Sequence, residues 1–256
     1  MRGRATGAHE PIRSPAVGAT VALLLAAGSG NRLGRQPKGF VELGGVPMFL
    51  HSCRAIAACQ QIDSLVILVP DGYTDPATKW AESIHGGPRV QVRIGGESRL
   101  ESVRRGLEVV ANDADVVVCH DAARPFASPD LFGRVLMGLA GVDGVVPVVP
   151  SPDTVKRVRE GRVVETVPRD ELGLVQTPQA FVAEALTEAH RRAVQAGLEA
   201  TDDAMLLEAA GYHVAAVDGD PGNFKITTAD DLRRAEFLLA DIHDAHGARA
   251  APGRPW

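Results

Sequence analysis

The sequence predicts an α/β fold: a mostly parallel, twisted sheet with helices on both faces. Short apolar runs rich in β-branched residues recur along the chain, which is typical of strands buried on both faces. Segments with a helical apolar stripe separate these runs, and such alternation favours parallel strands. The 256 residues are enough for one domain with a buried core. We expect a folded body over residues 18–243 and disordered tails over 1–17 and 244–256.

The predicted elements follow one another in order along the chain. Core strands are predicted at residues 20–26, 64–69, 90–94, 115–120 and 144–149, and late strands at 213–217 and 224–226. Helices are predicted at 47–58, 99–111, 181–196 and 202–210. Asp75 and Ser128 each precede a proline, as helix N-caps do. Thr228 can cap a last helix, whose apolar face comprises Leu232, Ala235, Leu239 and Ile242.

The strand–helix pattern changes after residue 149. Residues 153–158 and 162–167 alternate polar and apolar side chains, and the Arg-Glu-Gly sequence at 159–161 separates them. This pattern predicts a β-hairpin with a glycine turn. Its polar surface favours an arm that projects from the sheet, over about residues 151–173, rather than a pair of core strands.

Composition and charge exclude several classes of protein. The net charge of −5 and the pI of about 5.9 do not fit a general nucleic-acid binder, although a few local cations could hold a small phosphorylated ligand. The three cysteines form no C-x-x-C pair, so we expect free thiols in a reducing, cytoplasmic setting. The longest apolar stretch is too short to span a membrane, and the N-terminus lacks the apolar core of a secretory signal.

The strongest local motif is the glycine-rich sequence AAGSGNRLG at residues 26–34, directly after a predicted strand. Gly28 and Gly30 let the backbone approach a phosphate, although an ordinary tight turn would read the same way. The spacing matches neither a Walker A motif nor the dinucleotide-binding fingerprint. Arg32 and Lys38 could neutralise charge on a phosphoryl group in transfer, or they could be solvated surface cations.

Three further segments carry candidate site residues. Asp121 follows a predicted strand, where α/β sheets bind ligands, and could hold Mg²⁺; the alternatives are a turn cap or an ion pair with Arg124. In GGESRLES at residues 95–102, Ser98 caps a helix or belongs to a loop that contacts a nucleotide. Lys225 lies in an apolar run, so its charge either reaches solvent or faces an anion in the site.

Taken together and in order, these motifs resemble one family. AAGSGNRLG with PK, GGESRLES, HDAARPF, PDTVKRV, TPQAF, TDDA and NFKIT are similar to motifs of the 2-C-methyl-D-erythritol 4-phosphate cytidylyltransferases, over residues 21–239. The resemblance implies a Rossmann-like nucleotidyltransferase domain whose β-hairpin arm embraces a second subunit of a homodimer. It also implies Mg²⁺ and the transfer of CMP from CTP to methylerythritol 4-phosphate, with release of pyrophosphate.

The resemblance also implies roles for individual residues. The triphosphate loop is matched by Ala26, Ala27, Gly28 and Gly30, and the cytidine-binding segment by Gly96, Glu97 and Ser102. The catalytic groups are matched by Arg32, Lys38, Asp121 and Lys225, with Asp121 next to the metal and Ala122 and Arg124 beside it. The polyol phosphate pocket is matched by Thr154, Arg169, Thr177 and Thr201, with Arg169 and Thr177 supplied from the second subunit's arm.

The chain departs from the common form of the family at a few positions. The loop between Arg32 and Lys38 is one residue shorter, and Gly39 follows the lysine where Gln or Ala is commoner. Glu97 stands where many members have Asp, and Gly222 stands where Asp is frequent. These departures bear on the fine contacts with the substrate, because every proposed cation is retained.

Three other functions remain open from the sequence. A ribitol-5-phosphate cytidylyltransferase shares the fold, CTP and the mechanism, but such relatives tend to have Ala-Gly-Gly where this chain has Ala26-Ala27-Gly28. Another sugar-phosphate nucleotidyltransferase would use UTP or GTP. A non-catalytic nucleotide-binding protein would not need the retained Arg32, Lys38, Asp121 and Lys225. A fusion to the cyclodiphosphate synthase, known for some relatives, is not expected, because the chain ends just after the last helix.

Overall fold

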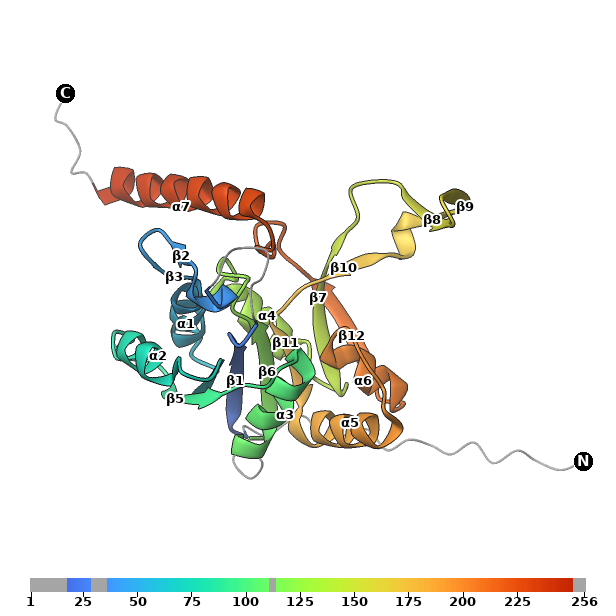
Figure 1. The fold of residues 1–256 in the computed structure, drawn as a ribbon, viewed down its shortest axis with the longest axis horizontal. Helices are drawn as coiled ribbons and strands as arrows, with labels where there is room; N and C mark the ends of the chain where they lie inside the picture. Colours follow the sequence, from blue (N-terminus) through green and yellow to red (C-terminus); the bar gives the residue numbers. More distant parts are fainter. Residues whose placement is uncertain (1–17, 29–35, 111–113, 251–256) are drawn as a thin grey trace, which may run out of the picture.

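An eight-stranded sheet organises the fold in the computed structural model, which describes residues 18–28, 36–110 and 114–250 (Figure 1). Its strands are β1 (Thr20–Leu25), β4 (Ser64–Val69), β5 (Arg89–Ile94), β6 (Val116–Asp121), β7 (Gly144–Pro150), β10 (Gly173–Val175), β11 (Gln179–Val182) and β12 (Val214–Asp218). They run in the order β10-β7-β11-β6-β1-β4-β5, and β12 pairs with β7. The pairs β1–β4, β1–β6, β4–β5 and β7–β12 are parallel, whereas β10 and β11 are antiparallel to their neighbours. The mostly parallel sheet is therefore confirmed.

Helices cover both faces of this sheet, as the apolar strands require. Alternate residues of β1 face opposite sides: Ala22 and Leu24 pack in one core cluster, and Val21 and Leu23 in the other. The first cluster contains residues of α1 (Met48–Ala58), α2 (Thr74–Ala81) and α4 (Pro129–Met137). The second contains residues of α3 (Arg99–Val110), α5 (Ala183–Ala196) and α6 (Asp203–Ala209).

The last helix, α7 (Ala229–Ala250), packs near the carboxyl end of the sheet through a third, smaller cluster. Thr228 caps it as predicted, because its Oγ1 accepts a hydrogen bond from the N–H of Asp231 at 3.2 Å. The helix does not end at residue 243. Its alanine-rich end favours helix and the next proline is Pro252, so the predicted C-terminal tail loses residues 244–250 to α7. Residues 1–17 and 251–256 lie outside the described residues.

Other differences from the sequence prediction have local causes. Residues 224–226 form an extended segment instead of a strand; it is attached to the fold by single hydrogen bonds such as that from Ile226 N–H to the carbonyl oxygen of Ala123. The predicted helix at 181–196 begins at Ala183, because Phe181 belongs to β11. Helix α2 begins at Thr74 with Tyr73 as its N-cap, so Asp75 lies in the first turn and is not the cap. Ser128 does cap α4.

The predicted hairpin is present and projects from the sheet (Figure 1). Strands β8 (Val155–Arg159) and β9 (Arg162–Val167) pair antiparallel, and their turn places Glu160 and Gly161 at φ of 49° and 75°. A 3₁₀ helix, η2 (Arg169–Glu171), then leads back towards β10. A smaller hairpin of β2 (Glu42–Leu43) and β3 (Val46–Pro47) follows another 3₁₀ helix, η1 (Lys38–Phe40). Among the described residues, no helix is both long and apolar enough to cross a membrane.

Candidate active site

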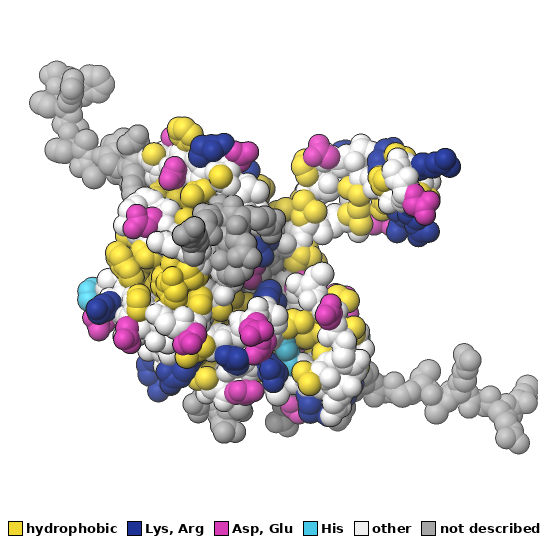
Figure 2. Space-filling view, in the orientation of Figure 1, with side chains coloured by type: hydrophobic (Ala, Val, Ile, Leu, Met, Phe, Trp, Pro, Cys, Tyr) yellow, Lys and Arg dark blue, Asp and Glu magenta, His cyan; other side chains and the backbone are white. Residues whose placement is uncertain are grey.

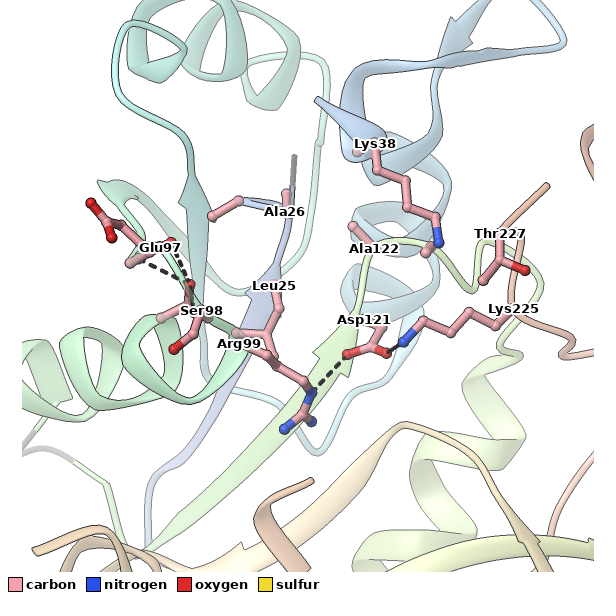
Figure 3. Close-up of a pocket in the computed structure, with 16 residues that line it drawn as sticks. Leu25, Ala26, Lys38, Glu97, Ser98, Arg99, Asp121, Ala122, Lys225 and Thr227 are labelled. Carbon is pink, nitrogen blue, oxygen red and sulfur yellow. Dashed lines mark hydrogen bonds and ion pairs between the residues drawn. The ribbon is translucent and has the colours of Figure 1, made fainter. Parts of the chain in front are cut away.

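A pocket of about 340 Å³ opens where β1 and β6 end (Figure 3). This is the carboxyl edge of the parallel strands, where open α/β sheets bind their ligands. Segments far apart in the sequence meet there. The lining residues are Leu25, Ala26, Ala27, Gly28, Lys38, Gly39, Gly96, Glu97, Ser98, Arg99, Ser102, Asp121, Ala122, Ala123, Lys225 and Thr227. The pocket thus brings together most of the nucleotide-binding and catalytic residues that the sequence analysis named.

The glycine-rich motif enters the pocket directly from β1. Its first part, Ala26 to Gly28, lines the pocket, and the N–H of Lys38 donates a 3.0 Å hydrogen bond to the carbonyl oxygen of Gly28. This bond brings the lysine backbone next to the start of the loop. A Cβ on Gly39 would lie 3.0 Å from the Cβ of Ala26, so the glycine permits this close approach. Gly30 and Arg32 lie outside the described residues.

Asp121 is the central acidic group of the pocket. Its Oδ2 lies 2.7 Å from Nζ of Lys225, and its Oδ1 accepts a 3.2 Å hydrogen bond from Nε of Arg99. Burial by itself raises the pKa of this carboxyl, but the Arg99 and Lys225 charges hold that pKa well below its usual range. Asp121 is therefore ionised at neutral pH. It is the ion-pair partner of Lys225 and Arg99, and the pairing with Arg124 is not formed.

Lys225 faces an anion, although the segment that carries it is not a strand. Arg124 fixes this segment: its Nη1 donates to the carbonyl oxygen of Asn223 at 2.9 Å, and its Nη2 to that of Val175 at 3.2 Å. Arg124 consequently supports the site from outside the pocket lining. Lys38 and Lys225 both point towards the region of Asp121 and Ala122 (Figure 3). Two ammonium groups and one carboxylate thus converge on the same part of the pocket.

The loop that starts at Gly95 forms another wall. Oγ of Ser98 accepts a 3.1 Å hydrogen bond from the N–H of Glu101, so Ser98 caps α3 and lines the pocket at the same time. Oγ of Ser102 accepts a 2.9 Å bond from the N–H of Gly96. A Cβ on Gly95 would lie only 2.6 Å from the Cβ of Ala27, so this loop needs glycine to lie against the glycine-rich motif. The Glu97 side chain points away from Asp121 (Figure 3).

The four residues assigned to the polyol phosphate lie in different places. Thr177 is buried beside Asp121, where its Oγ1 accepts a 3.0 Å hydrogen bond from the Asp121 N–H. Thr154 and Arg169 are exposed at the base of the arm, and Thr201 is exposed just before α6. None of the four lines the pocket formed by the described residues of their own chain. Of the four, the structure joins only Thr177 to the catalytic groups, and it does so within one chain, contrary to the expectation that a second subunit's arm supplies Thr177.

Sequence reasoning missed Arg99. It lies at the start of α3, reaches Asp121, and donates a 2.6 Å hydrogen bond from Nη1 to Oδ2 of Asp203. Arg99 belongs to the GGESRLES motif, but the motif points to a role in the site only when α3 is known to start at the pocket. Asp203 is fully buried, and its role was hidden because the neighbouring Asp202 already explains the start of α6 as its N-cap.

The described residues form no cluster of three or more His, Cys, Asp or Glu that could hold a metal ion by itself. The pocket lining contains two carboxylates, Asp121 and Glu97. Mg²⁺ commonly binds through one or two carboxylates together with substrate phosphates and water. The residues of the pocket fit this mode of binding, in which phosphates and water supply most of the ligands.

The fold and the pocket define a Rossmann-like α/β protein with an anion-binding site of nucleotidyltransferase type. The family model of 2-C-methyl-D-erythritol 4-phosphate cytidylyltransferase matches residues 20–241. The chain belongs to this family.

Relatives and solved structures agree with this assignment. A 2-C-methyl-D-erythritol 4-phosphate cytidylyltransferase of Frankia casuarinae is 41% identical over 248 residues, which cover 96% of this chain and 89% of the relative. A bifunctional enzyme IspD/IspF of Anaeromyxobacter dehalogenans is 44% identical; the match covers 91% of this chain but only 61% of that enzyme. The chain thus spans about three fifths of the bifunctional relative.

Among solved structures, the cytidylyltransferase of Thermus thermophilus is 36% identical with a TM-score of 0.70, covering 85% of this chain and 98% of that one. The 4-diphosphocytidyl-2C-methyl-D-erythritol synthase of Anaerococcus prevotii reaches a TM-score of 0.79 at 28% identity, covering 87% of this chain and 96% of that one. These likenesses confirm the predicted Rossmann-like class.

Proposed function

We propose that the protein transfers CMP from CTP to 2-C-methyl-D-erythritol 4-phosphate, giving 4-CDP-2-C-methyl-D-erythritol and pyrophosphate for isoprenoid biosynthesis. One observation carries the proposal: Asp121 lies between Arg99 and Lys225 at the end of β6, in the pocket that the glycine-rich motif and Lys38 also line. Family membership and the names of the relatives support the choice of reaction.

In the proposed mechanism, a phosphate oxygen of the polyol phosphate attacks the α-phosphorus of CTP in line. A new P–O bond forms, and the bond to the β-phosphate oxygen breaks with its electron pair leaving on pyrophosphate. Lys38 and Lys225 stabilise the negative charge of this transition state, and Ala27 and Gly28 line the pocket that would hold the triphosphate. By resemblance, Arg32 adds a further cation. Mg²⁺, held by Asp121 and the triphosphate, would supply further charge neutralisation.

The polyol phosphate pocket is proposed to need a second copy of the chain. Thr154 and Arg169 lie at the arm, away from the pocket of their own chain, and the arm exposes apolar side chains (Figure 2). Val158, Val163 and Val164 are 56%, 64% and 53% exposed, which favours burial against a partner. We therefore propose a homodimer in which the arm of one subunit completes the other subunit's site.

We also propose that the protein works in the reducing cytoplasm. The three cysteines, Cys53, Cys59 and Cys119, are free and buried. Unpaired thiols are usual in reducing compartments. The cytoplasm also contains the nucleoside triphosphate that the reaction requires.

The test is pyrophosphate release in the presence of Mg²⁺ and CTP, with methylerythritol 4-phosphate or ribitol 5-phosphate as acceptor and UTP and ATP as nucleotide controls. Release with CTP and methylerythritol 4-phosphate alone is the expected result. Release with ribitol 5-phosphate instead would retain the mechanism and change the substrate. A folded dimer that binds CTP and releases no pyrophosphate with either acceptor would be a non-catalytic nucleotide-binding protein.

A further inference from the structure

Arg99 joins the carboxylate of the pocket to a second carboxylate below it. Its Nε donates to Oδ1 of Asp121 at 3.2 Å, and its Nη1 donates to Oδ2 of Asp203 at 2.6 Å. Oδ1 of Asp203 in turn lies 3.0 Å from Nε2 of His190. A chain of charged and polar groups therefore runs from α5 through α6 and α3 to the end of β6.

The buried carboxylate of Asp203 is stabilised by Arg99 and His190. Its side chain is fully buried, and an isolated buried carboxylate is costly. The Arg99 charge and the His190 hydrogen bond offset the burial, which would otherwise raise the pKa of Asp203, and they lower that pKa below its usual value. Because Asp203 is held on α6 and by His190, it fixes the direction of the guanidinium that it binds.

Two side chains hold the Asp121 carboxylate, and a third anchors the Asp121 backbone. Lys225 binds Oδ2, Arg99 binds Oδ1, and the backbone N–H of Asp121 is anchored to Oγ1 of Thr177. Figure 3 shows Arg99 and Lys225 reaching the carboxylate from opposite sides. Without the Arg99 bond, Lys225 alone would bind the carboxylate, and the Lys225 side chain is 41% exposed.

The geometry requires the shape of arginine and not just its charge. Arg99 binds two carboxylates in different directions through nitrogens of one planar group, whereas a lysine ammonium is a compact point charge. If its only task were to neutralise Asp203, the Nε contact with Asp121 at the pocket would serve no purpose. Arg99 also lines the pocket itself.

We propose that Arg99, aligned by Asp203, is a positioning residue that sets the orientation of the Asp121 carboxylate for CMP transfer. The inference rests on the proposed function, because it gives the orientation of Asp121 its purpose. Arg99 acts through Asp121, and Asp203 acts through Arg99. Its role thus differs from that of Lys38 and Lys225, whose ammonium groups converge on the pocket.

The test compares Arg99→Lys and Asp203→Asn with the wild-type protein. Both changes keep the side chains similar in size, and Arg191→Lys is the matched control because Nε and Nη2 of Arg191 also bind a carboxylate, that of Glu188, on the exposed face of α5. We expect kcat to fall about 10- to 100-fold in both test variants, as when a supporting partner of a functional ligand is removed. The Kd for CTP, measured by calorimetry, should change less than about threefold, and Arg191→Lys should behave as wild type.

Thermal unfolding and crystal structures of the variants separate positioning from a merely structural role. The expected result is a rotated Asp121 carboxylate in Asp203→Asn, with folding retained and kcat reduced. Wild-type kcat in folded Arg99→Lys or folded Asp203→Asn, with Asp121 unmoved, would overturn the inference. If Arg99→Lys does not fold, Asp203→Asn decides the question. Absence of turnover in the wild-type protein would count against the proposed function, and the crystallographic comparison would still show whether Arg99 positions Asp121.

Discussion

The pocket and the arm are built on opposite physical principles. At the pocket, the carboxylate of Asp121 is buried and finds its partners, Arg99 and Lys225, within the chain. On the arm, the ion pair between Arg157 and Glu165 is about half exposed on each side, and such pairs contribute little to stability. Valines on the arm remain exposed (Figure 2).

This difference separates the expected effects of mutations. A change at the pocket acts on groups that depend on one another within one chain, so it should alter chemistry or folding. A change on the outer face of the arm removes little from its own chain and should act on association instead. Three measurements test this separation, beginning with the largest expected effect.

Removal of the Lys38 ammonium gives the largest effect. Lys38 lines the pocket, and we expect Lys38→Ala to lower turnover about 10²- to 10³-fold, the usual loss when one group that stabilises transition-state charge is removed. The fold should survive, because the hydrogen bond to Gly28 uses the Lys38 backbone N–H, which alanine retains. Pyrophosphate release measures the turnover, and circular dichroism monitors the fold.

Lys79 provides the matched control for this variant. It is exposed in the last turn of α2 and is not among the pocket-lining residues, so Lys79→Ala should retain wild-type turnover. Near-normal turnover in Lys38→Ala would remove Lys38 from the mechanism. An equal loss in both variants would mean that turnover depends on the total positive charge of the protein and not on the position of Lys38.

The sequence predicted the pocket well where chemistry and strand ends coincide. The apolar runs located β1 and β6. The glycine-rich motif follows β1 and Asp121 is the last residue of β6, so their meeting at one edge follows from parallel pairing. That Gly28 and Gly30 let the backbone approach a phosphate stays a prediction, whereas the structure shows that Gly95 lies against Ala27 of the same motif. Local periodicity is sufficient for such features.

Periodicity could not predict the contacts that depend on tertiary packing. Strand β11 has only four residues, which merge with the apolar start of α5, so its insertion between β6 and β7 was missed. Asp75 and Ser128 both precede proline, yet only Ser128 is the cap, since α2 starts two residues earlier than the dipeptide suggests. Asp203 is a partner of Arg99 across 104 positions, and such a pair has no local signature.

The second largest effect is the loss of folding stability at acid pH, which we expect to come from His120. This side chain is fully buried: Nδ1 lies 3.0 Å from Oγ1 of Thr177, and Nε2 lies 3.2 Å from the carbonyl oxygen of Arg124. The carbonyl oxygen of Arg124 can only accept, so Nε2 donates to it, and Nδ1 of a neutral imidazole then accepts from the Thr177 hydroxyl. Burial lowers the pKa of His120 from 6.5 to about 4.

The sign follows from proton binding. Between pH 6.5 and about pH 4 the unfolded chain binds a proton at His120 that the folded chain does not, so stability is full above this window and falls as the pH drops through it. The loss should reach about 3 kcal/mol, at about 1.4 kcal/mol per pH unit. Urea unfolding of the metal-free protein at several pH values measures it. His120→Gln should flatten this slope, so a steep slope in that variant would contradict the assignment.

A mutation on the arm should have the smallest effect on the stability of a single chain. It also tests most directly whether the arm differs from the pocket in acting on association. Val163 pairs with Val158 across the hairpin and is 64% exposed, so Val163→Asp should leave the free energy of unfolding of the isolated subunit nearly unchanged. In the proposed homodimer the same change places a charge in an apolar interface. Loss of one buried valine contact, worth about 1.5 kcal/mol, should raise the dissociation constant of the dimer at least about tenfold.

Val194 is a close control. It is 63% exposed, but it lies on α5, a helix that packs against the sheet and is not part of the arm. Val194→Asp should leave the dimer intact, and sedimentation velocity over a range of concentrations distinguishes the two variants. If Val163→Asp dissociates the dimer and also lowers turnover, while CTP binding is retained, the arm contributes to the acceptor side of the site. A monomeric wild-type protein with full activity would instead make the pocket complete within one chain, and the exposed valines of the arm would then require another explanation.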